Sequence, residues 1–581
     1  MIATPAEKTA SIAPANEIHS AAGSVPDPSG GGTAQIPSRP VGAPTPGPRR
    51  RSSEPLIDSA APTRRGITSR HPAVNIVLIM ADQLAASVLP CYGNPVARTP
   101  HLDTLAEAGC VFEHAYCNSP ICAASRASMM TGRLPSEIGV YDNGAELPAA
   151  APTFCHALRR HGYRTVLSGK MHFVGPDQLH GFEERLTTDI YPSGFDWTPD
   201  WNDGCVHNPG ASVRDLDAAG LCAGSLQIDY DEEVAFQAVR CIYDHARQPE
   251  RPLFLCASFT HPHDPFIITP EYWNLYRDGD IPPPRTRALA LEAMHPYARW
   301  VGVHHELDLF PPTPEVVTRT RHAYYGMVSY LDAKVGQILR ALRQAGLAER
   351  TAVLFTSDHG EMLGEHGMWY KRVFYEDAAR VPLLLRWPER VRAGRVPQVC
   401  SLLDLAPTLC AIAGIGGSGR DPVAAQFHGA SLLPLAAGQV RNWRDEACAE
   451  YLGEGVIQPC RMLRRGRYKA VFVRDEPGQL FDLEADPLEQ HDLAGLPEVA
   501  AVEAELRAAL VRGFDPDAMN SAVRQSQAIR RALASALASG RAHPWDFLPA
   551  PPEPGRYVRR ETVPSAARRR HLPVPDRSAD E

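Results

Sequence analysis

The chain has 581 residues, 44% of them hydrophobic and 22% charged, with a formal net charge of −8, so it is long enough for a large core in two or more structural units. The lack of a basic excess argues against nucleic acid, and apolar runs shorter than the roughly 20 residues of a membrane helix predict a soluble protein without a membrane partner. Thirteen scattered cysteines, an odd number, are typical of reduced thiols and predict a cytoplasmic location.

The N-terminal segment differs in composition from the rest of the chain. Residues 1–72 are rich in Pro, Gly and Ser and hold few groups that can form a core, so we predict a disordered extension. Arg49, Arg50 and Arg51 raise the question of an export signal, but no apolar run follows them. We therefore interpret this basic run as solvated charge.

From residue 73 onward, short apolar runs alternate with helical patterns, which predicts a largely parallel sheet flanked by helices. The predicted strands are residues 74–80, 163–169, 251–260 and 350–357. Ionisable or amide side chains follow them in chain order: Asp82 and Gln83, Lys170 and His172, His261, His263 and Asp264, and Asp358 and His359. Because the carboxyl ends of parallel strands share one edge of a sheet, we expect these groups to converge on one site.

The residue types at these strand ends indicate a reaction. Asp82, Asp358 and His359 offer carboxylate oxygens and an imidazole, which suit a divalent cation such as Ca²⁺ or Mg²⁺. Taken singly, an Asp after a strand is more often a helix cap, and a His is often a core residue. Donors that can hold an anion and protonate a leaving oxygen come from Lys170, His172, His261 and Lys371. The combination favours ester hydrolysis at a sulfuryl or phosphoryl centre.

The stretch SPICAASRASMMTGRLP, residues 119–135, has the pattern of a helix start, where backbone N–H groups favour an anion. Cys122 in it is a core residue, a metal ligand or a nucleophile; a buried hydrophobe is the usual role of a cysteine. Arg126 favours the nucleophile, because one helical turn beyond Cys122 its guanidinium lies on the same face and can pair with charge at that position.

The same residues resemble a family, the sulfatases of the alkaline-phosphatase-like superfamily. CAASR (122–126) and the pair Thr131-Gly132 match its signature Cys/Ser-x-Pro-x-Arg followed by Thr-Gly, except that Ala124 stands where proline is usual. In this family the cysteine is oxidised to formylglycine, whose hydrate is the nucleophile. One hydroxyl attacks sulfur and the alcohol leaves; loss of the second hydroxyl's proton then expels sulfate and restores the aldehyde. The resemblance runs from about Asn75 to Asp492.

The resemblance implies an α/β fold: an alkaline-phosphatase-like central, mostly parallel sheet flanked by helices, with a smaller C-terminal α+β subdomain. We predict a catalytic domain over residues 73–430, the subdomain over 431–540 and a tail over 541–581. A hairpin signal, RYKAVFV then DEPG then QLFDL, and helical patterns over 497–514 and 517–540 support the subdomain. In the choline-sulfatases of this family, tails similar to residues 541–581 wrap a neighbouring subunit. The resemblance therefore implies a homo-oligomer, a dimer or tetramer.

Within the family, residues 168–201, 257–266, 357–372 and 543–549 are similar to the choline-sulfatases. The resemblance implies a small-molecule substrate, choline O-sulfate. Its quaternary ammonium donates no hydrogen bonds, so it needs aromatic faces and a carboxylate. The candidates for this contact are Trp197, His207, Asn208 and either Glu450 or Glu454. Trp197 as a core residue is the alternative.

The remaining roles are also carried over from the family. Modified Cys122 would bind the metal with Asp82, Asp358 and His359; Ca²⁺ is the first choice, with Mg²⁺ and Mn²⁺ as alternatives. Gln83 stands where many sulfatases have a second Asp and would be a weak or absent ligand. The other assignments place Arg126 beside the nucleophile, Lys170 and His261 on sulfate oxygens, His172 on the formylglycine hydrate and Lys371 at the bridging oxygen.

Two alternatives remain open from the sequence. One is a phosphonate or phosphate monoester hydrolase of the same fold, which would bind a different leaving alcohol. The other is an inactive metal-binding scaffold, in which Cys122 stays unmodified because Ala124 replaces the proline.

Overall fold

The computed structural model describes residues 74–541, apart from 278, 389 and 417–420. The predicted extension 1–72 and the tail after residue 541 lie outside the described residues. The described residues all fall in one compact unit.

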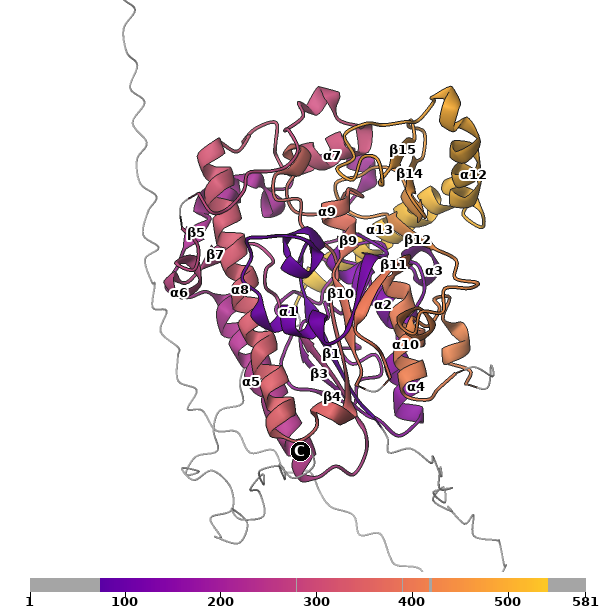
Figure 1. The fold of residues 1–581 in the computed structure, drawn as a ribbon. Coiled ribbons are helices and arrows are strands. Elements are labelled where there is room, and N and C mark those ends of the chain that lie inside the picture. The colour runs from indigo at the N-terminus through magenta and orange to yellow at the C-terminus, as the bar shows by residue number, and fades with distance from the viewer. Residues whose placement is uncertain (1–73, 278, 389, 417–420, 542–581) are drawn as a thin grey trace, which may run out of the picture. The chain divides into compact units, whose positions relative to one another are not determined.

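A nine-stranded sheet holds the predicted strands (Figure 1). Its strands are β1 Asn75–Ala81, β2 Cys110–Tyr116, β3 Arg164–Gly169, β4 Glu184–Arg185, β6 Leu253–Ser258, β8 Thr351–Ser357, β9 Arg380–Val381, β10 Leu383–Arg386 and β11 Gly394–Ser401. The order is β11-β2-β10-β8-β1-β6-β3-β4, with β9 paired to β2. The four predicted strands form the parallel run β8-β1-β6-β3, and antiparallel β10 joins that run to β2. The predicted mostly parallel sheet is confirmed.

Helices cover both faces of this sheet, which explains why β1 is buried along its whole length and reads as a continuous apolar run (Figure 1). On one side pack α1 Pro100–Glu107, α5 Leu226–Arg247 and α8 Pro314–Gln344; on the other pack α2 Cys122–Thr131, α4 Phe154–Arg160 and α10 Leu405–Ile412. The other helices before the C-terminal part are α3 Pro135–Ile138, α6 Pro270–Trp273, α7 Pro296–His304, α9 Glu376–Ala379 and α11 Leu433–Ala436. Strand β5 Gly220–Leu221 pairs with β7 Ile267–Ile268.

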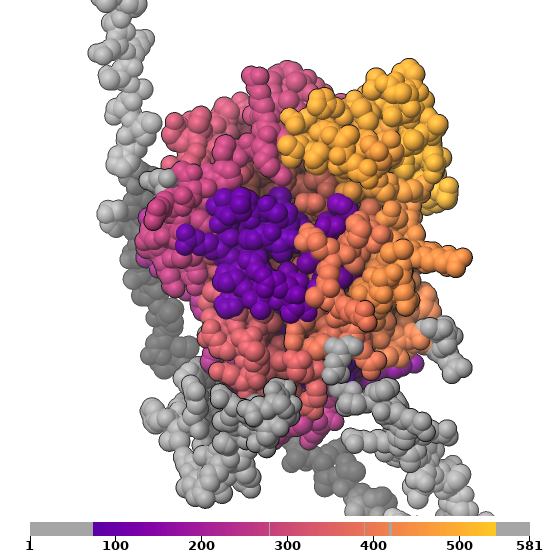
Figure 2. Space-filling view, in the orientation of Figure 1, coloured from indigo at the N-terminus to yellow at the C-terminus, as the bar shows by residue number. Residues whose placement is uncertain are grey.

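The C-terminal part forms a second, antiparallel sheet. Its order is β12 Glu446–Tyr451, β13 Cys460–Arg465, β14 Tyr468–Val473 and β15 Gln479–Asp482, so the predicted hairpin is present as β14 and β15. The two predicted helices are α12 Ala500–Val511, which packs on β13 and β14, and α13 Pro516–Ala538. Figure 2 shows these residues, in orange to yellow, packed directly against the rest. The predicted domain boundaries stay a prediction.

A buried ion-pair network joins the two sheets. Lys469 of β14, whose side chain is fully buried, pairs with Glu376 of α9 and with Glu489. Burial raises the pKa of Glu489 to about 7, although Lys469 lowers it. Such a network fixes the orientation of the C-terminal sheet, because a lysine in this position needs its carboxylate partners.

The cysteines and helices also bear on the expectations from composition. All thirteen cysteines are free thiols, in agreement with the prediction of reduced cysteines. Within the described part of the chain, no helix combines the length and the apolar character needed to cross a membrane. The cytoplasmic location stays a prediction.

Candidate functional site

The strand ends meet at a single buried arginine, Arg126 of α2. Its guanidinium donates to Asp82 after β1 and to Asp358 after β8, each at 2.8 Å. It also donates to the Lys170 carbonyl after β3 and to Ser258 Oγ at the end of β6, again at 2.8 Å. One side chain therefore links the carboxyl ends of four adjacent parallel strands.

This arrangement gives Arg126 a role beyond the predicted one. The sequence predicted that its guanidinium would pair with charge at position 122, one turn away on the same helix face. In the structure its hydrogen bonds go to the two carboxylates and to the ends of β3 and β6. Arg126 thus supports the site by fixing Asp82 and Asp358 beneath the thiol rather than by a hydrogen bond to it.

Asp82, Cys122, Asp358 and His359 form a compact buried cluster whose candidate ligand atoms all lie within 4.8 Å of one another. The His359 Nε2 atom lies 3.2 Å from Cys122 Sγ, and its Nδ1 lies 3.0 Å from the Gly360 carbonyl oxygen. A carbonyl oxygen can only accept a hydrogen bond, so Nδ1 of His359 carries the proton and donates it to Gly360. The lone pair of Nε2 then faces the cluster. Two carboxylates and one such imidazole fit a divalent cation.

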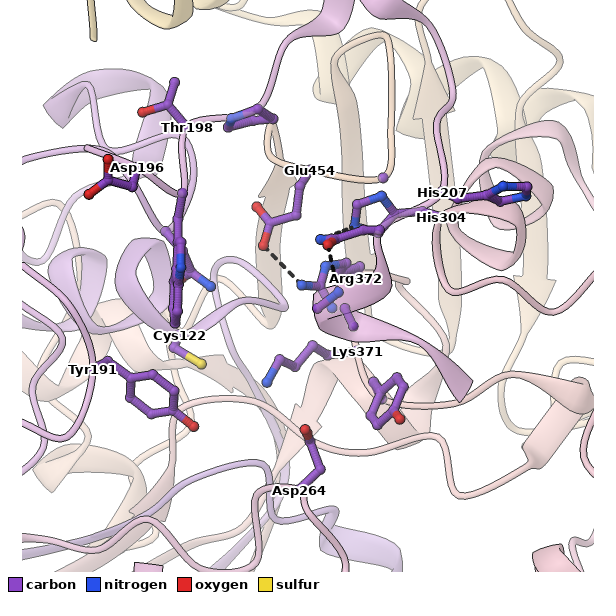
Figure 3. Close-up of a pocket in the computed structure, with 18 of the residues that line it drawn as sticks. Cys122, Tyr191, Asp196, Thr198, His207, Asp264, His304, Lys371, Arg372 and Glu454 are labelled. Carbon is purple, nitrogen blue, oxygen red and sulfur yellow. Dashed lines mark hydrogen bonds and ion pairs between the residues drawn. The ribbon is translucent and has the colours of Figure 1, made fainter. Parts of the chain in front are cut away.

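Cys122 occupies the first turn of α2, as predicted, and lines the floor of a cavity (Figure 3). Burial raises the pKa of the Cys122 thiol, but the charges of Lys170 and Lys371 outweigh burial and hold it well below its usual range. The same positive field favours any anion bound above residue 122. Ala124 also lies in the first turn of α2, where backbone N–H groups have no intrahelical acceptor. Alanine and proline therefore give the helix the same number of hydrogen bonds at this position.

Lys170 and His172 follow β3 and lie on the Cys122 side of the site. Lys170 is fully buried; its ammonium forms an ion pair with Asp82 and lies 4.0 Å from the centre of the Tyr191 ring. The His172 ring lines the cavity and stacks on Tyr191 with centroids 5.2 Å apart. The Tyr191 ring therefore contacts both Lys170 and His172.

His261 is held by an acidic residue that the sequence did not indicate. Asp231, fully buried within α5, lies 2.7 Å from His261 Nδ1 and accepts hydrogen bonds from the backbone N–H groups of Thr260 and His261. The buried Nε2 of His261 has no hydrogen-bond partner among the described residues. Asp231 therefore fixes the ring so that its second nitrogen is free for a bound anion.

Lys371 enters the cavity from the opposite side, and its ammonium points toward the space above Cys122 (Figure 3). It contacts the side-chain oxygen of Gln83 and lies 2.7 Å from His263 Nε2. The Gln83 amide nitrogen donates to Glu361 at 2.6 Å and to Asp264 at 3.1 Å. Gln83 thus orients Lys371, and its role as a weak or absent ligand stays a prediction.

The cavity has a volume of about 780 Å³, which suits a small molecule. Trp197 lines it with 43% of its surface exposed, and its ring makes edge contacts with His172 and Tyr191 at 5.6 and 5.7 Å. Glu454 also lines the cavity and pairs with Arg372 at 3.0 Å (Figure 3). Its second carboxylate oxygen is buried without a hydrogen-bond partner among the described residues. An aromatic face and a carboxylate therefore face the same space.

The other three candidates for the alcohol end differ in placement. Asn208 lines the cavity, and its amide lies 3.3 Å from His304 Nε2. His207 lies at the rim, where its ring turns away from Cys122 and pairs with Asp308 at 2.9 Å (Figure 3). Glu450 is placed elsewhere. Its buried carboxylate accepts hydrogen bonds from Ser136 and pairs with Arg461, because the β12 register turns it away from the cavity.

Sequence reasoning missed several residues of the site. His263 and Asp264 were visible after a predicted strand but were given no role. Tyr191 had only the signal of lying in a segment similar to the choline-sulfatases. Glu361 had the same signal, in the segment 357–372, and Asp231 had no signal at all, since a buried carboxylate looks in sequence like any solvated acid.

Comparison with known proteins agrees with this geometry. The family described as Sulfatase matches residues 74–415. The chain belongs to the sulfatase family. A second family description, N-sulphoglucosamine sulphohydrolase, C-terminal, matches residues 364–514 of this sulfatase.

Among its relatives, the choline-sulfatase of Rhizobium meliloti (strain 1021) is 42% identical over 498 residues, which cover 84% of this chain and 95% of the relative. The arylsulfatase of Clostridium perfringens is 28% identical and covers 76% of this chain and 94% of its own. The solved phosphonate monoester hydrolase of Agrobacterium radiobacter has a TM-score of 0.60 and 26% identity, covering 76% of this chain and 96% of its own. The chain is a sulfuric ester hydrolase with the expected alkaline-phosphatase-like fold.

The placement of Asp231 leads to a prediction. Asp231→Asn should lower kcat about 10- to 100-fold, because an amide cannot accept all the N–H groups around it and so releases the His261 ring. Steady-state kinetics with an aryl sulfate measure this, and thermal unfolding checks that the variant is folded. Asp229→Asn, on an exposed position of the same helix, is the matched control. A folded Asp231→Asn enzyme with the activity of the control would contradict the assignment.

Proposed function

We propose that this sulfatase hydrolyses choline O-sulfate to choline and sulfate. The observation that carries the proposal is that one cavity has a basic end, which suits a sulfate, and an aromatic and acidic end, which suits a cation. Its floor holds Cys122 among basic groups, while Trp197 and Glu454 line its walls. The choline-sulfatase relative at 42% identity supports the same substrate.

The nucleophile in this proposal is residue 122 after oxidation of its thiol to formylglycine. The hydrated aldehyde supplies an oxygen nucleophile of higher reactivity than a serine, and a second hydroxyl that releases the sulfate. Asp82, Asp358 and His359 would hold a divalent metal beside it, which supplies positive charge to the sulfate oxygens. Ca²⁺ fits the oxygen-rich donor set, and Mg²⁺ and Mn²⁺ are the alternatives.

The chain's own residues hold the sulfate and the departing oxygen. Lys170 and the free Nε2 of His261 donate to sulfate oxygens, and the His172 ring contacts the nucleophile. Lys371, whose ammonium points into the cavity, donates to the oxygen between sulfur and carbon. A proton delivered there stabilises the alcohol as it leaves.

At the other end of the cavity, the trimethylammonium group of choline would lie between an aromatic face and a carboxylate. Trp197 attracts the cation through its ring face. Glu454 shares its charge between Arg372 and the substrate, so its free oxygen faces a cation that cannot donate a hydrogen bond. The negative charge of Glu454 compensates for moving the cation out of water.

A second candidate function is phosphonate or phosphate monoester hydrolysis, favoured by the likeness to the phosphonate monoester hydrolase structure. The anion-binding floor suits a phosphoryl centre as well as a sulfuryl one. The two functions differ at the alcohol end, because a neutral leaving group gains nothing from the Trp197 face. Relative kcat/KM for choline sulfate and for a phenyl phosphonate ester distinguishes them.

The first prediction of this proposal concerns residue 122. Mass spectrometry of the tryptic peptide from protein made in a host that forms formylglycine should show the mass of the aldehyde, and Cys122→Ala should abolish turnover, because a methyl group forms no hydrate. Circular dichroism should show that the variant keeps its fold. An active enzyme that holds only the thiol would rule out the formylglycine assignment and favour a different nucleophile; an inactive one would favour the scaffold.

A second prediction concerns the metal. Treatment with EDTA should remove activity, and added Ca²⁺, Mg²⁺ or Mn²⁺ should restore it to different extents. Asp358→Asn should weaken metal binding about 10- to 100-fold, because it removes a formal charge from the donor set. Isothermal titration of the stripped protein measures the affinity without relying on turnover. Full activity of protein shown by elemental analysis to be metal-free would contradict the assignment.

A third prediction concerns the alcohol end. Trp197→Ala should raise KM for choline sulfate about two- to thirtyfold and leave KM for a neutral aryl sulfate nearly unchanged, because only the cation loses a cation–π partner. Val440→Ala, an exposed position outside the cavity lining, is the control for removing an exposed apolar side chain. Equal losses for both substrates would show that Trp197 has a packing role, and the choline assignment would lose its structural support.

A further inference from the structure

Arg530, in the C-terminal helix α13, lies directly behind the wall of the substrate cavity. Its side chain is only 8% exposed and forms a two-pronged ion pair with Asp142, at 2.6 and 2.7 Å. The same guanidinium donates to Thr198 Oγ1 at 3.0 Å. Arg530 therefore joins the C-terminal helix to two segments of the catalytic part of the chain.

The first of these segments leads to the nucleophile. Asp142 is fully buried and also accepts the Gly144 N–H at 2.9 Å. Between them, Asn143 accepts the Ala123 N–H at 3.0 Å with its side-chain oxygen, and so caps the first turn of α2 beside Cys122. Arg530 thus contacts this segment only through Asp142, while Asn143 itself makes the cap on α2.

The second segment carries Trp197. The two segments are packed backbone to backbone, because a Cβ atom added at Gly144 would lie 2.7 Å from Thr198 N and 2.9 Å from the Trp197 carbonyl carbon. Only glycine allows this close approach. Trp197 is 43% exposed, so its position depends on the ring contacts with His172 and Tyr191 and on the backbone that Arg530 and Gly144 hold.

We propose that Arg530 is a positioning residue that determines specificity for a cationic leaving alcohol, because it holds Asp142 and Thr198 together and thereby fixes the Trp197 face. The inference rests on the proposed function, in which Trp197 contacts a quaternary ammonium. Two parallel N–H donors on one carboxylate and a third bond to Thr198 require the planar guanidinium fork. A lysine keeps the charge but cannot hold all three contacts.

The test uses Arg530→Lys, since Arg530→Ala would leave the buried Asp142 carboxylate without a partner and endanger the fold. Arg530→Lys should raise KM for choline sulfate about three- to tenfold, part of the full cation–π loss, with kcat and the aryl sulfate KM within about twofold of wild type. The matched control is Arg474→Lys, because Arg474 pairs with Asp517 at the start of the same helix and lies outside the cavity lining.

A double-mutant cycle shows whether Arg530 acts through the tryptophan. In a Trp197→Ala background, Arg530→Lys should have no further effect on the choline sulfate KM, since the ring that it positions is absent. Persistence of the full effect, or an equal effect on both substrates in the wild-type background, would overturn the inference. Thr198→Val is a second variant that keeps the ion pair with Asp142, and we expect a smaller shift in the same direction.

A readout independent of substrate separates this inference from the proposed function. In protein labelled with 5-fluorotryptophan, the Trp197 resonance is assigned by its loss in Trp197→Phe. Arg530→Lys should shift or broaden it, and Arg474→Lys should not. If the resonance changes while Trp197→Ala fails to discriminate between substrates, the choline assignment is wrong and the positioning role stands. If the resonance does not change, the inference about Arg530 is wrong.

Discussion

The active site depends on the buried guanidinium of Arg126. Each of its hydrogen bonds ends on a different strand of the parallel run, so the spacing of the site follows from the spacing of the sheet. Both of its carboxylate partners are fully buried and would repel each other without it. Removing one partner of such a cluster costs about 3–5 kcal/mol, because a buried charge is left unpaired. A substitution that removes Asp82, Asp358 or Arg126 should therefore lower the stability of the sheet edge as well as disturb the site.

Much of this edge could be predicted from the sequence, and the reason is topological. Asp82, Lys170, His261 and Asp358 each follow a continuous apolar run, and parallel strands bring their carboxyl ends together whatever the intervening chain does. The apolar runs were enough to predict the four strands of the parallel run, but not the other five strands of the sheet. Helix α2 was found because its motif is local, from Cys122 to Gly132.

The residues that hold these groups in place could not be predicted, because their contacts carry no local signal. Asp231 lies in the middle of a helix, and Arg530 meets Asp142 across 388 positions of sequence. The choice between Glu450 and Glu454 depended on the register of β12, in which Glu450 faces Ser136 and Arg461. A one-residue difference in register reverses the face of every side chain on a strand, so composition alone could not decide it.

The two ends of the cavity are formed by different parts of the chain. In the proposed function, one end carries out the reaction and the other selects the alcohol. The strand ends and Arg126 fix the basic floor of the cavity around Cys122, so the geometry of this floor follows that of the sheet. The alcohol end is formed by the segment around Trp197 and by Glu454, which follows β12 of the C-terminal sheet. Because α13 and β12 both belong to the C-terminal part, the proposed function gives this part a role in substrate selection and gives the chemistry to the sheet edge. Under that proposal, changes in the C-terminal part would alter the preferred leaving alcohol while the groups that hold the sulfate stay in place.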